Sequence, residues 1–262
     1  MAISGKNGNV YSSALLVEDC EDVWVAGTGA SVISVVTGKV GTYCVRDTTT
    51  TLGASALMMT EIVSLNLTTY DGVYLWFRSS VNTAAGDLAL LLDDTALCAT
   101  PLEVLNLPAL TATTWKQCFA RLSDPSLLGS LISVGMRQVT DLADGTFDID
   151  DVQALKEIDG VKSWTLDYTS DTLDATDFDD AGVKAYIIGG SGWSGSFEGF
   201  KDTTPLSIGS EVYLTLGESI TAYQNWIGKA IITACHPSTS HDGIVTYSYD
   251  FQGTGALESP SA

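Results

Sequence analysis

The stretch SWTLDYTSDTLDATDFDDAGVKAYIIGGSGWSGSFEGF, residues Ser163 to Phe200, decides the fold of this chain. Trp164, Leu166 and Tyr168 alternate with polar residues, which is the period of a half-buried β-strand. The aspartate-rich run from Asp171 to Asp180 follows, and we expect it to be a loop. This stretch therefore predicts a strand, a polar loop and a return.

The residues after this loop predict a second strand and a hairpin. Val183 to Ile188 leads to a glycine-rich turn, and Trp193 and Phe197 then stand among small polar residues at strand period. Near the C-terminus, an Asp-Gly turn dipeptide precedes the alternation from Ile244 to Phe251.

Composition extends this pattern to the whole chain. Of 262 residues, 45% are hydrophobic, which is enough for a core in one large or two ordinary domains. Gly, Thr, Ser and Val are frequent, and few stretches keep a helical period for three turns. We therefore expect an all-β protein.

The charge of the chain argues against one class of function. The formal net charge is −20, so no basic patch is available to neutralise the phosphates of a nucleic acid. We expect no membrane span and no signal peptide, because no long apolar run occurs. The cysteines are odd in number, lack C-x-x-C spacing and are expected to be free thiols: Cys20, Cys44, Cys98, Cys118 and Cys235.

The ordered series of a W-x-L strand, a D-x-T-x-F/D-D loop, a G-W-x-G-S-F strand and a C-terminal hairpin resembles the tube (major tail) proteins of long-tailed bacteriophages. The likeness covers residues 1–12 and roughly 156–257. It implies a virion structural protein of the phage tail, assembled in the host cytoplasm. Its copies would form homohexameric rings that stack into a tube beside other phage tail proteins. DNA would pass through the lumen without sequence-specific binding, and a negative wall would let it slide.

The same resemblance gives the predicted loop a role. In tube proteins this region reaches a neighbouring subunit, which would make Leu173 and Phe178 apolar inter-subunit contacts within a polar rim.

The tube-like pattern is interrupted after its first strand. The opening residues match M-A-x-x-G-K-x-G-x-V-Y, but the next part of the pattern appears only at residues 154–162. We therefore expect a discontinuous tail-tube-like domain, a β-sandwich or barrel formed by 1–12 plus 154–262. A second domain, 13–153, would be inserted at a loop tip.

The insert resembles galactose-binding-like jelly rolls, which include many carbohydrate-binding modules. The matching elements are Val17-Glu18-Asp19 with Trp24, Tyr74 to Phe77, Thr114-Trp115-Lys116 and Asp148 to Val152. The likeness implies an inserted jelly-roll β-sandwich that projects outward as a decoration and touches host surface glycans.

A sugar platform is one predicted site in the insert. Tyr74 and Trp76 share one face of a strand while Leu75 and Phe77 share the other, so one pair belongs to the core. Tyr74 and Trp76, if exposed on the concave face, would stack on pyranose rings; core packing is the alternative.

Calcium is the other predicted ligand. The jelly-roll resemblance implies a structural Ca²⁺ between the first and last strands, held by Glu18 and Asp150 with Asp151 as substitute. Solvated carboxylates are the alternative.

No catalytic residue is predicted, and we expect no enzyme. Adjacent carboxylates such as Asp93-Asp94 point to opposite faces of a strand, so they are not acid/base pairs. His236 and His241 flank a polar turn and are expected at the surface. Two alternatives to the tube subunit stay open. One is a capsid or neck decoration protein, and the other is a free carbohydrate-binding module.

Overall fold

The computed structural model describes residues 9–27, 32–50, 53–142, 144–177, 179, 183–201, 204–218 and 224–260, with the backbone alone for residues 13 and 14. In these ranges the chain forms strands and a few short 3-10 turns, which confirms the all-β prediction. None of the described residues belongs to a helix of the length and hydropathy needed to cross a membrane.

The chain groups into two compact units. The first contains Met1–Glu157, Thr215–Ile227 and Glu258–Ala262, and the second contains Ile158–Leu214 and Gly228–Leu257. The first unit holds the whole predicted insert, and the predicted tail-tube-like domain contributes to both units. The domain bounds 13 and 154 stay a prediction.

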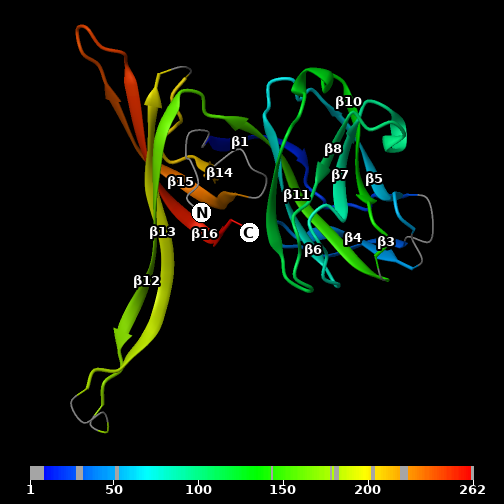
Figure 1. Cartoon of the computed structure of the whole chain (residues 1–262), viewed down its shortest axis with the longest axis horizontal. Helices are drawn as coiled ribbons and strands as arrows, with labels where there is room; N and C mark the ends of the chain where they lie inside the picture. Colours follow the sequence, from blue (N-terminus) through cyan, green and yellow to red (C-terminus); the bar gives the residue numbers. More distant parts are fainter. Residues whose placement is uncertain are drawn as a thin grey trace. The chain divides into compact units, whose positions relative to one another are not determined.

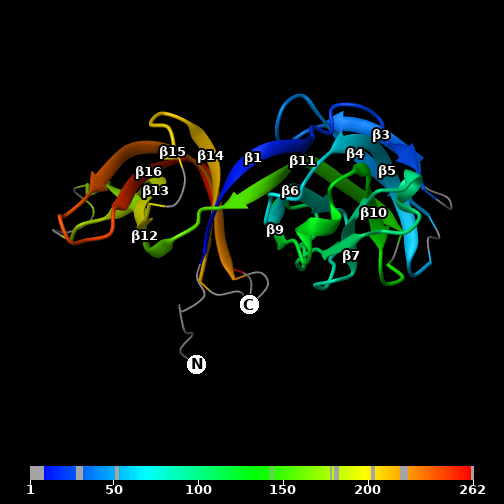
Figure 2. The same ribbon diagram turned by 90° about the horizontal axis from the view of Figure 1, so that it is seen from above.

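Two sheets of antiparallel strands form the sandwich of the first unit (Figures 1 and 2). The first sheet contains β1 (Val10–Glu18), β3 (Val32–Thr37), β4 (Tyr43–Thr49), β6 (Gly72–Ser79), β9 (Lys116–Arg121) and β11 (Gly145–Glu157). The second contains β2 (Val25–Ala26), β5 (Ala56–Leu65), β7 (Leu88–Asp93), β8 (Glu103–Asn106) and β10 (Leu131–Gln138). Short 3-10 turns at η2 (Ala96–Cys98) and η3 (Pro125–Leu127) connect strands.

The core of the first unit lies between these sheets. Inward side chains such as Phe77 and Phe147 of the first sheet meet Met58, Leu90 and Met136 of the second, and all five are buried. Their alternation with outward residues is the strand period that the sequence showed.

Strand β11 is the centre of the first sheet. One of its edges pairs with β6 from Phe147 to Leu155. Its other edge pairs first with β4, as far as Ile149, and then with β1, from Val152 onward. The partner changes at Asp150 and Asp151, where the ladder shifts register and Asp151 has a positive φ of 50°.

The two predicted ends of the insert face each other in the ladder between β1 and β11. Ser13 is the register partner of Leu155, one residue from the predicted boundary at 154. Both strands continue past this point, with a register shift in their ladder between Ser13 and Leu15. The Gly217 N–H donates to the Asn9 carbonyl (2.7 Å), which ties the end of β14 to the start of β1.

The second unit is built on a sheet in the order β12-β13-β16-β15-β14. These strands are β12 (Val161–Asp174), β13 (Tyr186–Phe200), β14 (Glu211–Gly217), β15 (Asn225–Ser238) and β16 (Thr246–Glu258). The final residues of β14 and β16 and the first residues of β15 belong to the first unit.

Two local predictions in this unit were wrong. The expected loop begins after Asp174 and not at Asp171, because Thr172 to Asp174 still pair with Ile188 to Tyr186. The expected glycine-rich turn at 189–192 is instead the middle of β13. Glycine is typical of turns, but here Ser191 and Gly192 pair with β12, and nothing lies within 4 Å of a Cβ built on Gly190 or Gly192.

The Trp193 side chain requires glycine on β16, the neighbouring strand, and on β15, the strand beyond it. A Cβ atom on Gly228 would lie 2.4 Å from its Cζ2 atom, and one on Gly253 would lie 2.1 Å from its Cε2 atom. Its indole Nε1 donates to the Gly255 carbonyl (2.9 Å), and the Trp193 carbonyl accepts from Gln252 Nε2 (2.9 Å). The ring therefore lies directly on bare backbone.

We predict that Gly253→Ala lowers the free energy of unfolding by about 1–3 kcal/mol, because the new methyl group overlaps the Trp193 ring. Chemical denaturation followed by tryptophan fluorescence measures this change. Gly190→Ala is the matched control, since nothing lies within 4 Å of a Cβ built there. Equal stability of the two variants would contradict the tight fit of Trp193.

Candidate functional site

A two-stranded arm extends from the sheet of the second unit (Figure 1). Strand β13 pairs with β12 from Gly199 down to Tyr186, but its pairs with β16 begin only at Ser194. Residues 168–174 and 186–193 therefore form a ribbon with two sheet edges that no strand among the described residues covers. Unpaired edges of this kind are templates for pairing with another chain.

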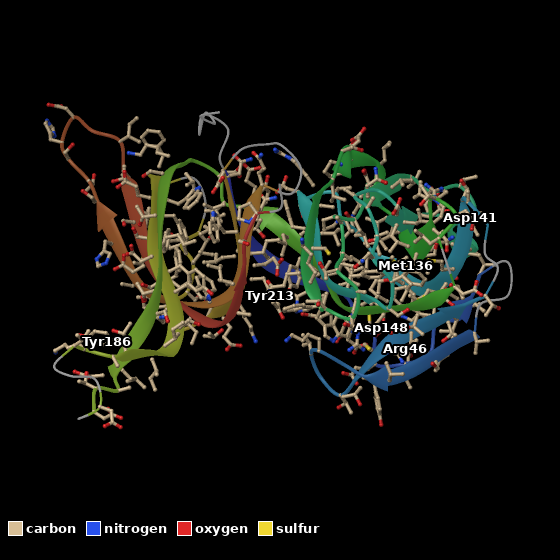
Figure 3. The ribbon with its side chains drawn as sticks, turned by 60° about the horizontal axis from the view of Figure 1, so that its bottom comes forward. Arg46, Met136, Asp141, Asp148, Tyr186 and Tyr213 are labelled. Carbon is tan, nitrogen blue, oxygen red and sulfur yellow. The ribbon has the colours of Figure 1, made fainter. Side chains whose placement is uncertain are left out.

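The arm exposes large apolar side chains. Ile188 is 84% exposed, and Tyr168, Leu173, Tyr186 and Ile187 are each more than half exposed. Tyr186 lies far along the arm in Figure 3. A lone two-stranded ribbon is marginally stable in water, and clustered apolar exposure marks an interaction surface. The arm therefore has the features of a segment that a partner covers.

Polar bonds hold the ribbon together at the far end of β12. The Ala175 N–H donates to the Ala185 carbonyl (2.9 Å), and Lys184 Nζ lies 3.4 Å from Asp174 Oδ2. Hydrogen bonds from Thr176 lower the pKa of Asp174. Leu173 lies in this region and is exposed, whereas Phe178 lies outside the described residues. Their role as inter-subunit contacts stays a prediction.

The sheet of the second unit has one aromatic face. Trp164 pairs with Phe197 and Phe197 with Tyr249, so their side chains form a row on one side. The rings of Phe197 and Tyr249 stack at 5.0 Å, and Phe197 stacks on Phe251 at 6.2 Å. This face supplies the core of the unit.

The opposite face of the same sheet is polar and mainly acidic. By register it carries Asp167, Glu198 and Asp250. Its nearby bases are Lys162, 3.8 Å from Glu198, and His236, 3.1 Å from Asp250. Strand alternation thus concentrates carboxylates on one side of the sheet, which net charge alone could not show.

In the first unit, the predicted sugar platform is not exposed. Tyr74 is fully buried and Trp76 is 8% exposed, so neither ring is open to a pyranose as the prediction required. Tyr74 lies between its register partners Phe119 and Gln153, and Lys39 Nζ lies 4.9 Å from the centre of the Trp76 ring. Neighbours on the same sheet face therefore cover both side chains.

Two arginines share the Asp148 carboxylate at the next position on this face, and Figure 3 labels Arg46 and Asp148. Arg46 donates to Asp148 through Nε (2.6 Å) and Nη2 (2.9 Å), and Arg78 Nε donates to the same carboxylate (2.7 Å). Asp148 is 1% exposed. The Arg78 guanidinium also stacks 4.5 Å from the Trp115 ring. This cluster was not predicted from the sequence, where its one local signal is that Asp148 stands between two core residues, Phe147 and Ile149.

The three predicted calcium ligands have other hydrogen-bond partners. Asp150 Oδ2 accepts from the N–H groups of Lys39 (2.7 Å) and Val40 (2.9 Å). Glu18 accepts from the Cys20 N–H, and Asp151 accepts from Gln153 Nε2.

Within the described ranges, no group of three or more His, Cys, Asp or Glu side chains is placed to hold a metal ion. Oδ1 of Asp150 is buried without a hydrogen-bond partner there, but one such oxygen is not a calcium donor set. Calcium binding stays a prediction without geometric support.

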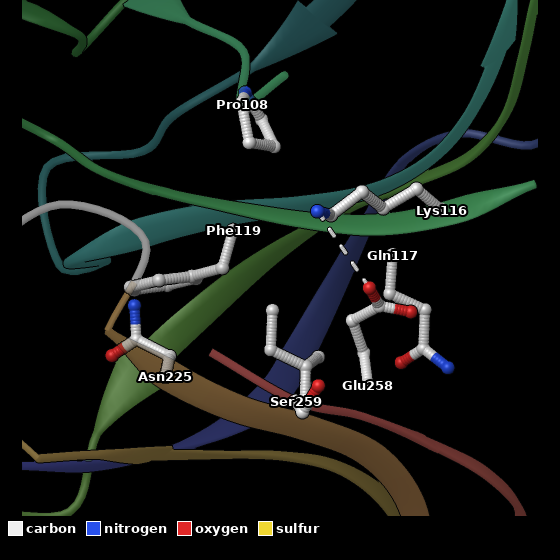
Figure 4. Close-up of a pocket in the computed structure, with 8 residues that line it drawn as sticks. Pro108, Lys116, Gln117, Phe119, Asn225, Glu258 and Ser259 are labelled. Atoms are coloured by element: carbon white, nitrogen blue, oxygen red, sulfur yellow. Dashed lines mark ion pairs between the residues drawn. The ribbon is translucent and has the colours of Figure 1, made fainter. Parts of the chain in front are cut away.

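A small pocket in the first unit is lined in part by Phe119, Ile227, Lys116 and Glu258 (Figure 4). Lys116 Nζ lies 3.7 Å from Glu258 Oε1, and burial raises the pKa of Glu258. The carboxylate in this pocket thus faces a lysine, with no second carboxylate among the lining residues to make an acid/base pair.

The buried acids of the first unit predict a pH dependence. Burial raises the pKa of Asp150 to about 6 and that of Glu18 to about 7. The folded state then keeps protons that the unfolded state releases at about pH 4 to 5. Their contribution to the free energy of unfolding is therefore full below about pH 4 and is lost as the pH rises through about 6 to 7.

Urea denaturation between about pH 4.5 and about pH 7.5 tests this dependence, and Asp150→Asn should flatten the decline. Asp167→Asn, at an exposed position on the second unit, is the control. Wild-type stability that rises over this range without the Asp150→Asn variant changing its slope would contradict the assignment. Repeating the series with added Ca²⁺ tests the predicted metal, because a bound cation would reverse the Asp150 effect.

Comparison with known proteins gives matches to solved structures alone. No family model matches the chain, and no curated protein matches it. The tail of an empty gene transfer agent particle, solved with C6 symmetry, is 18% identical over 41% of this chain and 87% of that chain, with a TM-score of 0.35. The virion of a native gene transfer agent particle is 19% identical over 41% and 89%, with a TM-score of 0.33.

Carbohydrate-binding modules are the second group of matches. The CBM22-2 xylan-binding domain of Paenibacillus barcinonensis Xyn10C is 14% identical over 50% of this chain and 89% of that chain, with a TM-score of 0.32. The tandem CBM22-1–CBM22-2 domain of the same protein is 11% identical over 97% and 92%, with a TM-score of 0.34. Both parts of the sequence resemblance, a tail protein and a carbohydrate-binding module, thus occur among the matches. Their identities and TM-scores establish no family, so function is argued from the geometry.

Proposed function

We propose that this chain is a tail tube subunit whose copies form stacked homohexameric rings around a DNA channel. The exposed arm of β12 and β13 carries this proposal. It combines uncovered sheet edges with apolar side chains such as Ile188, which is 84% exposed. Closing a ring would bury these side chains and pair these edges, and a closed ring leaves no edge free for uncontrolled growth.

The acidic face of the second unit supports the channel. Asp167, Glu198 and Asp250 lie on the side of the sheet opposite the aromatic row. A channel wall formed by this face would repel phosphates and let DNA slide without binding it. Other tail proteins would bind at the ends of such a tube. The proposal includes no catalytic residue.

The jelly roll would decorate the outside of this tube. It is joined to the rest of the chain through β1 and β11, and the predicted ends of the insert meet in their ladder at Ser13 and Leu155. An outward position would leave it accessible to host surface glycans in the assembled virion.

Negative-stain electron microscopy of the purified protein tests the assembly, and rings or tubes are the expected result. Ile188→Asp should abolish them while leaving the fold intact, because it puts a charge into the proposed subunit contact. Ile62→Asp is the matched control, since Ile62 is 71% exposed but lies on β5 of the first unit.

A wild-type protein that stays monomeric at high concentration and binds neutral glycans would favour the free carbohydrate-binding module. If the Ile188→Asp variant still assembled, the arm would not be part of the contact between subunits. Closed shells or collars of another symmetry would favour the capsid or neck decoration protein.

Deletion of residues 14–153 tests the insertion. Register partners on antiparallel strands lie about 5 Å apart, so a short turn can join Ser13 to Ala154, which neighbours the paired Leu155. We expect a folded protein that still assembles into rings. Circular dichroism and electron microscopy measure the outcome, and a soluble but unfolded product would show that the tube-like part does not fold without residues 14–153.

A further inference from the structure

We infer that the outer face of the first sheet in the first unit binds an acidic saccharide, through Lys39, Arg46, Arg78, Trp76 and Trp115. The inference deepens the glycan contact of the proposed decoration domain and rests on that role. The predicted stacking of sugar rings on Tyr74 and Trp76 is thereby replaced by binding to cationic side chains on the same face.

Charge distribution is the first argument. The chain has 12 Lys and Arg residues against 32 Asp and Glu. Yet Arg46 and Arg78 share one face of one sheet, and Lys39, from the connection between β3 and β4, lies over Trp76 on that face. Register places Arg46, Asp148 and Arg78 in one row across β4, β11 and β6. A cationic cluster on so acidic a protein is a local reversal of sign that an anionic ligand would recognise.

The arginine geometry leaves donors for a ligand. Both guanidinium groups use Nε and Nη2 on Asp148, so two positive charges share one carboxylate. Each Nη1 is without a hydrogen-bond partner among the described residues, and the two side chains are 29% and 25% exposed. A fixed guanidinium fork matches a carboxylate group by two parallel hydrogen bonds.

Two aromatic rings support the cations. Arg78 lies on Trp115 and Lys39 lies on Trp76, and contacts of this kind hold a cation in place while it keeps its charge. Residues 76 and 78 share one face of β6 and are about 7 Å apart along the strand, so one ligand can reach both pairs.

A buried donor and a buried acceptor point to hydroxyl groups on the ligand. Trp76 Nε1 and Asp150 Oδ1 are both buried without hydrogen-bond partners among the described residues. The two residues are register partners on β6 and β11. A hydroxyl group accepts and donates at once, so sugar hydroxyl groups beside the Lys39 ammonium are the ligand groups that match these two atoms. Carboxylate and hydroxyl groups together define a uronic-acid type of saccharide.

Isothermal titration of the full-length protein with an oligogalacturonate tests the site, with a neutral xylo-oligosaccharide of equal length as comparison. We expect the acidic oligosaccharide to bind more tightly and to weaken as ionic strength rises. Arg46→Lys should weaken binding about tenfold, because a lysine cannot keep the fork on Asp148 and the ligand. Lys39→Gln should weaken it several-fold.

Lys162→Gln is the matched control and should bind like the wild type, since Lys162 also lies over a ring, that of Phe200, but in the second unit. If Arg46→Lys fails to fold, Lys39→Gln is the deciding variant, because Lys39 is exposed and its substitution leaves the core unchanged. Equal binding of the neutral oligosaccharide, wild-type affinity of Lys39→Gln, or displacement by inorganic sulfate at the same concentration would overturn the inference. Binding only to a sulfated glycan would overturn the carboxylate assignment.

Electron microscopy of the same preparations separates this inference from the proposed function. Rings that bind no acidic saccharide would overturn the site and leave the tube subunit standing. A protein that binds the acidic saccharide but forms no ring would overturn the tube subunit and leave the saccharide site standing.

Discussion

The contact of one indole ring with bare backbone is the constraint on which the second unit depends. Trp193 is 3% exposed and lies against Gly253 of the adjoining strand β16 and Gly228 of β15, the strand beyond it. A Cβ atom at either position would overlap the ring. Gly228 and Gly253 therefore leave the space that the Trp193 ring fills. The exposed arm begins where β13 no longer pairs with β16.

The first unit depends on a different constraint, the change of partner along β11. A single strand serves β4 and β1 on one edge because its ladder shifts at Asp150 and Asp151. The backbone N–H groups of Lys39 and Val40 would otherwise lack acceptors near this break, and the Asp150 carboxylate supplies one. Asp150, which was predicted as a calcium ligand from the sequence, thus accepts hydrogen bonds from the backbone at this break.

Local periodicity explains which parts of the fold could be predicted from the sequence. The strands around Trp164 and Trp193 were predicted correctly because the alternation follows the half-buried Trp164 and Leu166 on β12 and the buried Trp193 and Phe197 on β13. The turn expected at 189–192 was wrong because glycine content alone does not distinguish a turn from an exposed strand, and these residues continue β13 beside β12. The end of β12 was misplaced because aspartates can pair in an exposed ribbon as well as in a loop.

The sites were harder to predict for a physical reason. Tyr74 and Trp76 were expected on one shared face, and they lie there, but the residues that cover them come from other strands. The row of Arg46, Asp148 and Arg78 depends on the register between three strands, which no single stretch of sequence encodes. Leu173 was different, because its exposure follows from its own place in the arm.

The pairing of β1 with β11 also has a mechanical consequence. A domain carried on a single peptide linker swivels, whereas one carried on two hydrogen-bonded strands is held at both of its ends. Both strands cross the predicted boundary covalently, so a load along them is carried by two backbones that the ladder between them keeps side by side. Force on residues 13–153 would therefore be shared between β1 and β11 and would not fall on a single peptide linker.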